Sequence, residues 1–172
     1  KQDITAGNAD LSFKLDRLFR DSAAWYHFCI AVDTTQATAA NRVKIYINGI
    51  LQTSYDVETY PDQNDDTYVN HTNLHMIGHG DNSIDGYLAE VYLIDGTAET
   101  PSSFGELSST TNQWIPLDSD DVKDAVTFGT NGFYQKYGFT ELANSFADSA
   151  DHTPHTMTAN GNAHTDTTIK KF

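Results

Sequence analysis

The segment that most constrains the fold is RVKIYINGILQTSY, residues 42–55. From Val43 to Ile47 apolar and polar residues alternate, which gives one face of a β-strand an apolar surface. The Asn48-Gly49 pair that follows is typical of a type I′ turn, because both central residues of that turn need positive φ angles. We expect a second strand, from Ile50 to Tyr55, to fold back on the first. The segment therefore predicts an antiparallel β-hairpin.

Other short runs indicate further strands, at 25–33, 74–80, 87–94 and 127–137. The runs 25–33 and 87–94 are apolar on both sides, which predicts strands that are buried on both faces. Residues 11–19 fit a short helix or an edge strand. Residues 99–107 resemble a helical turn with Thr100 as N-cap and Pro101 at the first helical position.

Many short strands, with turn signals every ~8–12 residues and almost no helix, predict an all-β chain folded as an antiparallel β-sandwich. The 172 residues are enough for one domain with a core.

The net charge of −14 opposes binding to nucleic acid and to anionic lipid. Plain solubility explains this charge better than cation binding does. No apolar run approaches the ~20 residues that a membrane-spanning helix needs. Cys29 has no second cysteine to pair with, so we expect a small buried hydrophobic residue there. Because the sequence starts at Lys1 rather than Met, we expect a processed product or a piece of a longer protein.

Four motifs follow one another in a suggestive order: AWYHFCIAVD (24–33), NRVKIYINGI (41–50), HMIGHG (75–80) and IDGYLAEVYLIDG (84–96). This order resembles the second half of a laminin-G-like, concanavalin A-like lectin/glucanase domain. It is most similar to the version found in structural proteins of tailed phages, such as tail or fibre proteins. Segments similar to IDGTAETPSSFGE (94–106), WIP (114–116) and GTNGFY (129–134) follow the last strand there.

The resemblance implies a jelly-roll β-sandwich of which residues 1–137 form the C-terminal part. Residues 138–172 resemble the opening strands of a following module. Fewer strands precede the first motif here than in the family, so the sandwich is expected to be incomplete. An incomplete sandwich exposes strand edges and an apolar face. We therefore expect a fragment of a multi-module protein, or an assembly in which other chains supply strands.

The function implied by this resemblance is that of a non-enzymatic structural or adhesion module, on a virion or another extracellular surface. Its expected partners are other modules or copies of the same protein and a surface glycan. A calcium-dependent lectin is one alternative, and a glycan hydrolase is a disfavoured second one.

Two groups of residues are candidates for binding. A glycan could stack on aromatic residues in or beside loops, and these are Tyr55, Tyr60, Tyr68 and Trp114. Packing is an equally common use of such aromatics. A calcium ion could bind the oxygens of Asp81, Asn82 and Asp85 in one tight turn, although a solvated turn is the ordinary interpretation.

No catalytic residue is predicted. Glu90 and Asp95 lie on opposite faces of one expected strand and roughly 16 Å apart, too far for the two carboxylates of a glycosidase. Glu90 is instead expected to make a structural contact. Successive members of the His71, His75 and His79 series would lie ~13 Å apart on a strand, too far to share one metal ion. We expect His27 to be a core or edge histidine with its hydrogen bonds satisfied.

Overall fold

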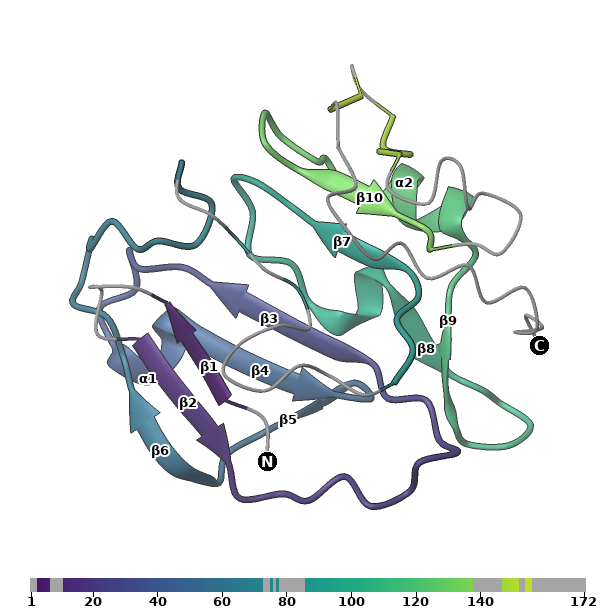
Figure 1. The fold of residues 1–172 in the computed structure, drawn as a ribbon, viewed down its shortest axis with the longest axis horizontal. Coiled ribbons are helices and arrows are strands. Elements are labelled where there is room, and N and C mark those ends of the chain that lie inside the picture. The colour runs from purple at the N-terminus through teal and green to yellow at the C-terminus, as the bar shows by residue number, and fades with distance from the viewer. Residues whose placement is uncertain are drawn as a thin grey trace. The chain divides into compact units, whose positions relative to one another are not determined.

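A computed structural model describes residues 3–6, 11–72, 75, 77, 86–137, 147–151 and 154–155, with the backbone alone described for 3–6. The strands are β1 (Asp3–Ala6), β2 (Leu11–Leu15), β3 (Phe28–Val32), β4 (Val43–Ile47), β5 (Ile50–Leu51), β6 (Tyr55–Thr59), β7 (Val91–Leu93), β8 (Gly105–Leu107), β9 (Trp114–Pro116) and β10 (Phe133–Gln135). The helices are α1 (Ala39–Arg42), the 3₁₀-helix η1 (Pro101–Ser103) and α2 (Ser119–Ala125). Small antiparallel sheets dominate these residues, which agrees with the predicted all-β class (Figure 1).

The chain divides into two compact units. The first contains residues 1–73 and 97–122, and the second contains residues 74–96 and 123–172. The first unit holds two three-stranded sheets, in the orders β1-β2-β6 and β3-β4-β5, and the β8-β9 pair. The second unit holds the β7-β10 pair.

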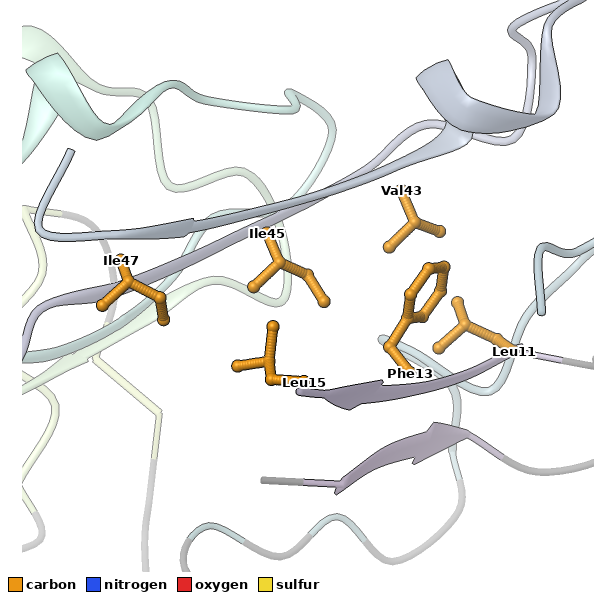
Figure 2. Packing of buried hydrophobic residues seen from close by; sticks show 6 residues of the cluster. All are labelled: Leu11, Phe13, Leu15, Val43, Ile45 and Ile47. Atoms are coloured by element: carbon orange, nitrogen blue, oxygen red, sulfur yellow. The ribbon is translucent and has the colours of Figure 1, made fainter. Parts of the chain in front are cut away.

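A core of six apolar side chains joins the two three-stranded sheets of the first unit. Strands β2 and β4 are each the middle strand of their sheet, and each buries every second residue. Figure 2 shows the two rows of side chains pointing toward one another, with none of them more than 2 % exposed: Leu11, Phe13, Leu15, Val43, Ile45 and Ile47. The alternation read from 42–55 therefore marks the core face correctly.

The predicted hairpin is confirmed. Strand β4 pairs with β5 in antiparallel register, and Ile47 lies opposite Ile50. Asn48 has a φ of 48° and Gly49 a φ of 77°, both positive, as a type I′ turn requires. The returning strand is shorter than predicted, because β5 ends at Leu51 and Tyr55 already belongs to β6.

Three expectations for single strands are wrong. The segment 11–19 was expected to be a helix or an edge strand, but its strand β2 lies in the middle of a sheet. The run 25–33 was expected to be buried on both faces, but Phe28 and Ile30 in β3 are 40 % and 45 % exposed. The reason is that β3 lies at the edge of its sheet, whereas the core is filled from β2 and β4.

The run 87–94 was expected to be a central strand in a covered sheet, and this is the third wrong expectation. Tyr87 and Leu88 are exposed, and β7 begins only at Val91. Glu90 has a φ of 54°, which is incompatible with an extended strand, so the ladder starts after it. Strand β7 pairs with β10, which lies within the predicted segment 127–137.

The predicted helical turn at 99–107 is confirmed in part. Thr100 is the N-cap and Pro101 the first residue of η1, but the Thr100 side chain makes no capping hydrogen bond and instead contacts the Ser102 hydroxyl at 2.8 Å. Cys29 is buried, as predicted. Most of 74–80 and of 138–172 lies outside the described residues, so the strands expected there stay predictions.

Candidate functional site

The outer edge of β3 presents backbone groups that no described strand pairs with. At the two ends of the β3-β4 ladder, the Asn48 N–H donates to His27 C=O at 2.9 Å and the Asp33 N–H donates to Arg42 C=O at 2.7 Å. Backbone groups alternate in direction along an antiparallel strand. The odd-numbered positions of β3 therefore face β4, and the N–H and C=O groups of Phe28, Ile30 and Val32 point to the other side. Since β3 ends the strand order of its sheet, this edge is open as far as the described residues go.

An apolar surface lies beside this open edge. Phe28 is paired with Ile47 and Ile30 with Ile45, so each pair shares the core face of the sheet. Ile45 and Ile47 are fully buried there, whereas Phe28 and Ile30 are each two-fifths exposed or more. The core face of this sheet is thus covered over its middle strand and only partly covered over β3.

Strand β3 lacks the features that usually protect an edge strand. Its sequence, FCIAV, contains no charged residue and no proline, and its register with β4 runs through five pairs without a bulge. Charge repulsion is also small in this part of the sequence. Residues 11–51 contain five Lys or Arg and three Asp, although the whole chain has a net charge of −14. The edge therefore suits pairing with another strand.

Two of the tyrosines proposed for glycan binding pack on the core. The rings of Tyr55 and Tyr60 contact Phe13 edge to face, with centroid distances of 5.3 and 4.9 Å. The Tyr55 hydroxyl donates to the Gln52 C=O at 2.7 Å, and the Tyr60 hydroxyl donates to Glu58. Burial raises the pKa of both phenols, and nearby Glu58 adds to the effect. Both residues thus have packing roles in the first unit.

Trp114, the third aromatic candidate, lies in a cluster of rings and glycines. The indole stacks on the imidazole of His27 at 5.6 Å, and Gly49 and Gly105 lie close to it, since a methyl group on either would come within 2.6 Å of the ring. Burial lowers the pKa of His27, which favours the neutral imidazole. Its Nδ1 and the indole Nε1 are buried without a hydrogen-bond partner among the described residues, so these residues do not supply the satisfied hydrogen bonding that was expected of His27.

The remaining predicted binding residues are Tyr68, which lies with other partners, and the three calcium candidates, which the structure does not describe. The Tyr68 ring is half-buried and lies 5.4 Å from the His71 ring. Asp81, Asn82 and Asp85 lie outside the described residues, so the calcium site stays a prediction. Within the described ranges, no three His, Cys, Asp or Glu side chains gather as metal ligands would. The structure brings Tyr55 and Tyr60 together at Phe13, and it places Tyr68 and Trp114 with other partners.

Glu90 makes the structural contact that was expected of it. Its carboxylate accepts hydrogen bonds from two tyrosine hydroxyls, Tyr92 at 3.1 Å and Tyr134. The two phenol rings stack with centroids 4.3 Å apart and an interplanar angle of 7°. Burial raises the pKa of Tyr92, and Tyr134 and the Glu90 carboxylate add to the rise. Asp95 is held separately, by the Asn131 N–H at 3.1 Å.

A buried carboxylate, Asp148, fastens a C-terminal segment to β10 in the second unit. Its Oδ1 accepts from the N–H groups of Tyr134 and Ala150, both at 3.0 Å. Its Oδ2 accepts from the N–H of His155 at 3.0 Å and lies 2.9 Å from the Nδ1 of that ring. Burial raises the pKa of the Asp148 carboxyl, but these hydrogen bonds outweigh it and lower the pKa to about 2. This contact could not be predicted from the sequence, because Tyr134 and His155 are 14 and 7 residues away from Asp148.

Asp148 makes the stability of the folded protein depend on pH in the acidic range. Because its pKa is lower in the folded protein than the usual value of about 4, the ionised carboxylate stabilises the fold above about pH 4. This contribution should disappear as the pH falls from about 4 toward 2. Asp148→Asn, which weakens the contacts to buried N–H groups, is expected to cost about 1–3 kcal/mol at pH 7. Urea unfolding of both proteins across this pH range measures the difference, and a difference that persists unchanged at pH 2 would contradict the assignment.

No protein family, curated protein or solved structure matches this chain. Among the described residues, no helix has the length and apolarity that crossing a membrane requires.

Proposed function

We propose that this chain is a non-enzymatic structural module that assembles with copies or neighbouring modules of the same protein by pairing strands at the edge of β3. The observation that carries the proposal is the open edge itself, with outward backbone groups at Phe28, Ile30 and Val32 beside an apolar surface. Such an edge is a template for one further strand.

The packing of the first unit supports the finer fold of a β-sandwich. Two antiparallel three-stranded sheets contribute one face each to a shared core, as the sheets of a sandwich do. Partial cover over β3 is what a sandwich with missing strands would leave. The motif order that resembles laminin-G-like domains of phage structural proteins supports the same fold. On that resemblance we place the module on a virion or an extracellular surface.

A second copy can supply the missing strand in a simple way. Two β3 strands that meet antiparallel about Ile30 would bring Phe28 of one copy opposite Val32 of the other. The contact is then the same on both sides, as a two-fold interface requires. It would join two three-stranded sheets into one continuous sheet and cover Phe28 and Ile30 further.

The test is self-association of the purified chain, with Ile30→Lys as the variant. A lysine on the exposed apolar face of an edge strand opposes strand pairing, as inward charges do in natural edge strands. We expect the unchanged chain to associate in the micromolar range by sedimentation velocity. Ile30→Lys is expected to weaken the association about tenfold or more, because a charge is buried at the centre of the contact.

Val57→Lys is the matched control. Val57 is 42 % exposed, close to the 45 % of Ile30, and its strand β6 is the edge of the other three-stranded sheet. The Val57→Lys variant adds the same charge outside β3, so we expect its association constant to equal that of the unchanged chain. A chain that is a compact monomer at every concentration, or equal effects of the two lysines, would contradict the proposal.

A further inference from the structure

Residues 99–117 pack on the outer face of the β3-β4-β5 sheet, the face opposite the core, and we call them the cover segment. Cys29 lies on this outer face, because the neighbouring positions Phe28 and Ile30 lie on the core face. The Cys29 thiol donates to the Glu99 C=O with a sulfur-oxygen distance of 3.9 Å, and the residue is 7 % exposed. The cover segment therefore shields the single thiol of the chain.

The cover segment is held together by its own backbone hydrogen bonds. Strand β8 pairs with β9 over three residue pairs. The Phe104 N–H donates to the Pro101 C=O at 3.0 Å, and the Phe104 C=O accepts from the Leu117 N–H at the same distance. These bonds link η1 to the β8-β9 pair, so the segment can move away from the sheet as one body.

His27 is the point at which two rings of the cover segment meet the sheet. The Trp114 indole stacks on the imidazole with centroids 5.6 Å apart, and the centroid of the Phe104 ring lies 6.3 Å away. His27 is itself fixed to the hairpin turn of the sheet. Its N–H donates to the Asn48 Oδ1 at 2.7 Å, and its C=O accepts from the Asn48 N–H at 2.9 Å. A change in the imidazole thus acts directly on the contact between the cover segment and the sheet.

A proton on His27 would place a buried donor at this contact. A neutral imidazole has one N–H, whereas an imidazolium has an N–H at both nitrogens. The Nδ1 of His27 and the Nε1 of Trp114 are both buried, and neither has a hydrogen-bond partner in the described part of the chain. The indole N–H cannot accept a hydrogen bond. An indole face attracts a cation, but it does not replace the missing acceptor, and a buried donor without an acceptor costs free energy.

The cover segment brings no negative charge to His27 from its described contacts. The side chains that touch His27 through a ring or a hydrogen bond are uncharged: Asn48, Phe104 and Trp114. Glu106 of β8 lies on the face of the β8-β9 pair that Trp114 does not use, because neighbouring strand positions alternate. Glu99 acts on Cys29 instead. Burial, and after it the Glu99 charge, raise the pKa of that thiol to about 11.

The sheet side offers no negative charge at neutral pH either. The titratable residues that share the outer face with His27 are Cys29, its cross-strand partner Tyr46, and Lys44, which lies opposite Ala31. Thiol, phenol and ammonium groups are not anionic at neutral pH. The Lys44 ammonium opposes a second cation nearby. Burial lowers the pKa of His27 from its ordinary value of 6.5, which agrees with a site built for the neutral ring.

We infer that the cover segment is a pH-sensitive switch, which is closed while His27 is neutral and opens when His27 takes up a proton. Opening brings the imidazolium into water and uncovers Cys29. In the open state His27 has its ordinary pKa of about 6.5, and in the closed state its pKa is lower. The closed state is therefore fully stable above about pH 7 and loses stability as the pH falls below about 6.5. This range lies above that of Asp148, which acts in the second unit.

The test is the rate at which 4,4′-dithiodipyridine labels Cys29 in the full chain between about pH 7 and pH 5. The same chain in concentrated urea gives the reference rate at each pH. The ratio of the two rates is the protection of the thiol, free of the effect of pH on the reagent. We expect this protection to fall about tenfold, because each pH unit below 6.5 favours the open state by up to a factor of ten.

His27→Phe keeps a ring against Trp114 and removes the titrating group, so its thiol is expected to stay protected at about pH 5. His27→Gln also removes the titrating group, and it serves where the larger ring does not fit. His71→Gln is the matched control. His71 is exposed and lies 5.4 Å from the Tyr68 ring, so its loss should leave the pH dependence unchanged.

Two results would overturn the inference. One is a thiol that is equally protected at about pH 7 and pH 5. The other is a loss of protection that persists in the folded His27 variants, or that His71→Gln removes instead. The labelling uses the dilute chain, so its outcome does not depend on strand pairing at β3, and a failure of the Ile30→Lys test leaves it unaffected.

Discussion

Replacing Phe13 with alanine is expected to lower the free energy of unfolding by about 3–5 kcal/mol. Phe13 is fully buried between the two three-stranded sheets, where Figure 2 shows it among the side chains of β2 and β4. The substitution leaves a cavity and removes the edge-to-face contacts with Tyr55 and Tyr60. Urea unfolding, followed by circular dichroism, measures the loss.

Phe28→Ala is the matched control for this change. Phe28 has the same side chain and lies on the core face of the other sheet, but it is 40 % exposed. Its truncation in the dilute chain is expected to cost about 1–2 kcal/mol, since part of the ring is already in water. Equal losses for the two variants would mean that the core does not lie between β2 and β4.

Gly49→Ala is the second substitution with a large expected effect, about 2–4 kcal/mol. An added Cβ would lie 2.3 Å from the Trp114 ring, so the indole would have to move. The φ of 77° at Gly49 adds a cost of about 1 kcal/mol, because side chains disfavour the left-handed region. The fluorescence of Trp114, read in a Trp25→Phe background, should shift to longer wavelength as the ring is displaced.

Gly96→Ala separates the two causes. Gly96 also has a positive φ, 91°, but no atom lies within 4 Å of the position that a Cβ would take. This substitution is therefore expected to cost only about 1 kcal/mol, from the backbone conformation alone. Equal costs at Gly49 and Gly96 would show that Trp114 does not pack on the hairpin turn.

Features set by neighbouring residues could be predicted from the sequence. The hairpin at 42–55 depends on local alternation and on an Asn-Gly pair, and the structure has both the turn and the buried face. Helix α2 was missed although its signal is local. The helix begins within the acidic run DSDD (118–121), in which Asp118 accepts a hydrogen bond from the Asp120 N–H at 2.9 Å, as an N-cap does.

Features set by distant residues could not be predicted in detail. Whether β3 is covered depends on which strands lie beside it and above it, and the pattern FCIAV is the same in either case. The sequence did predict open strand edges, because fewer strands precede the first motif here than in the family that the chain resembles. It did not identify β3 as the open strand.

The candidate residues failed to form one site for the same reason. Aromatic residues near loops can stack on a ligand or pack on the core, and the choice depends on their neighbours. Tyr55 and Tyr60 lie against Phe13, while the Trp114 ring stacks on His27.

Amide hydrogen exchange along β3 tests the central claim most directly. In the dilute chain, the amides of Cys29 and Ala31 should be protected by β4, while those of Phe28, Ile30 and Val32 should exchange rapidly. At concentrations where the chain associates, these three amides should become protected as well. Protection of all five amides in the dilute monomer would contradict the account, because the edge of β3 would then already be paired within the chain.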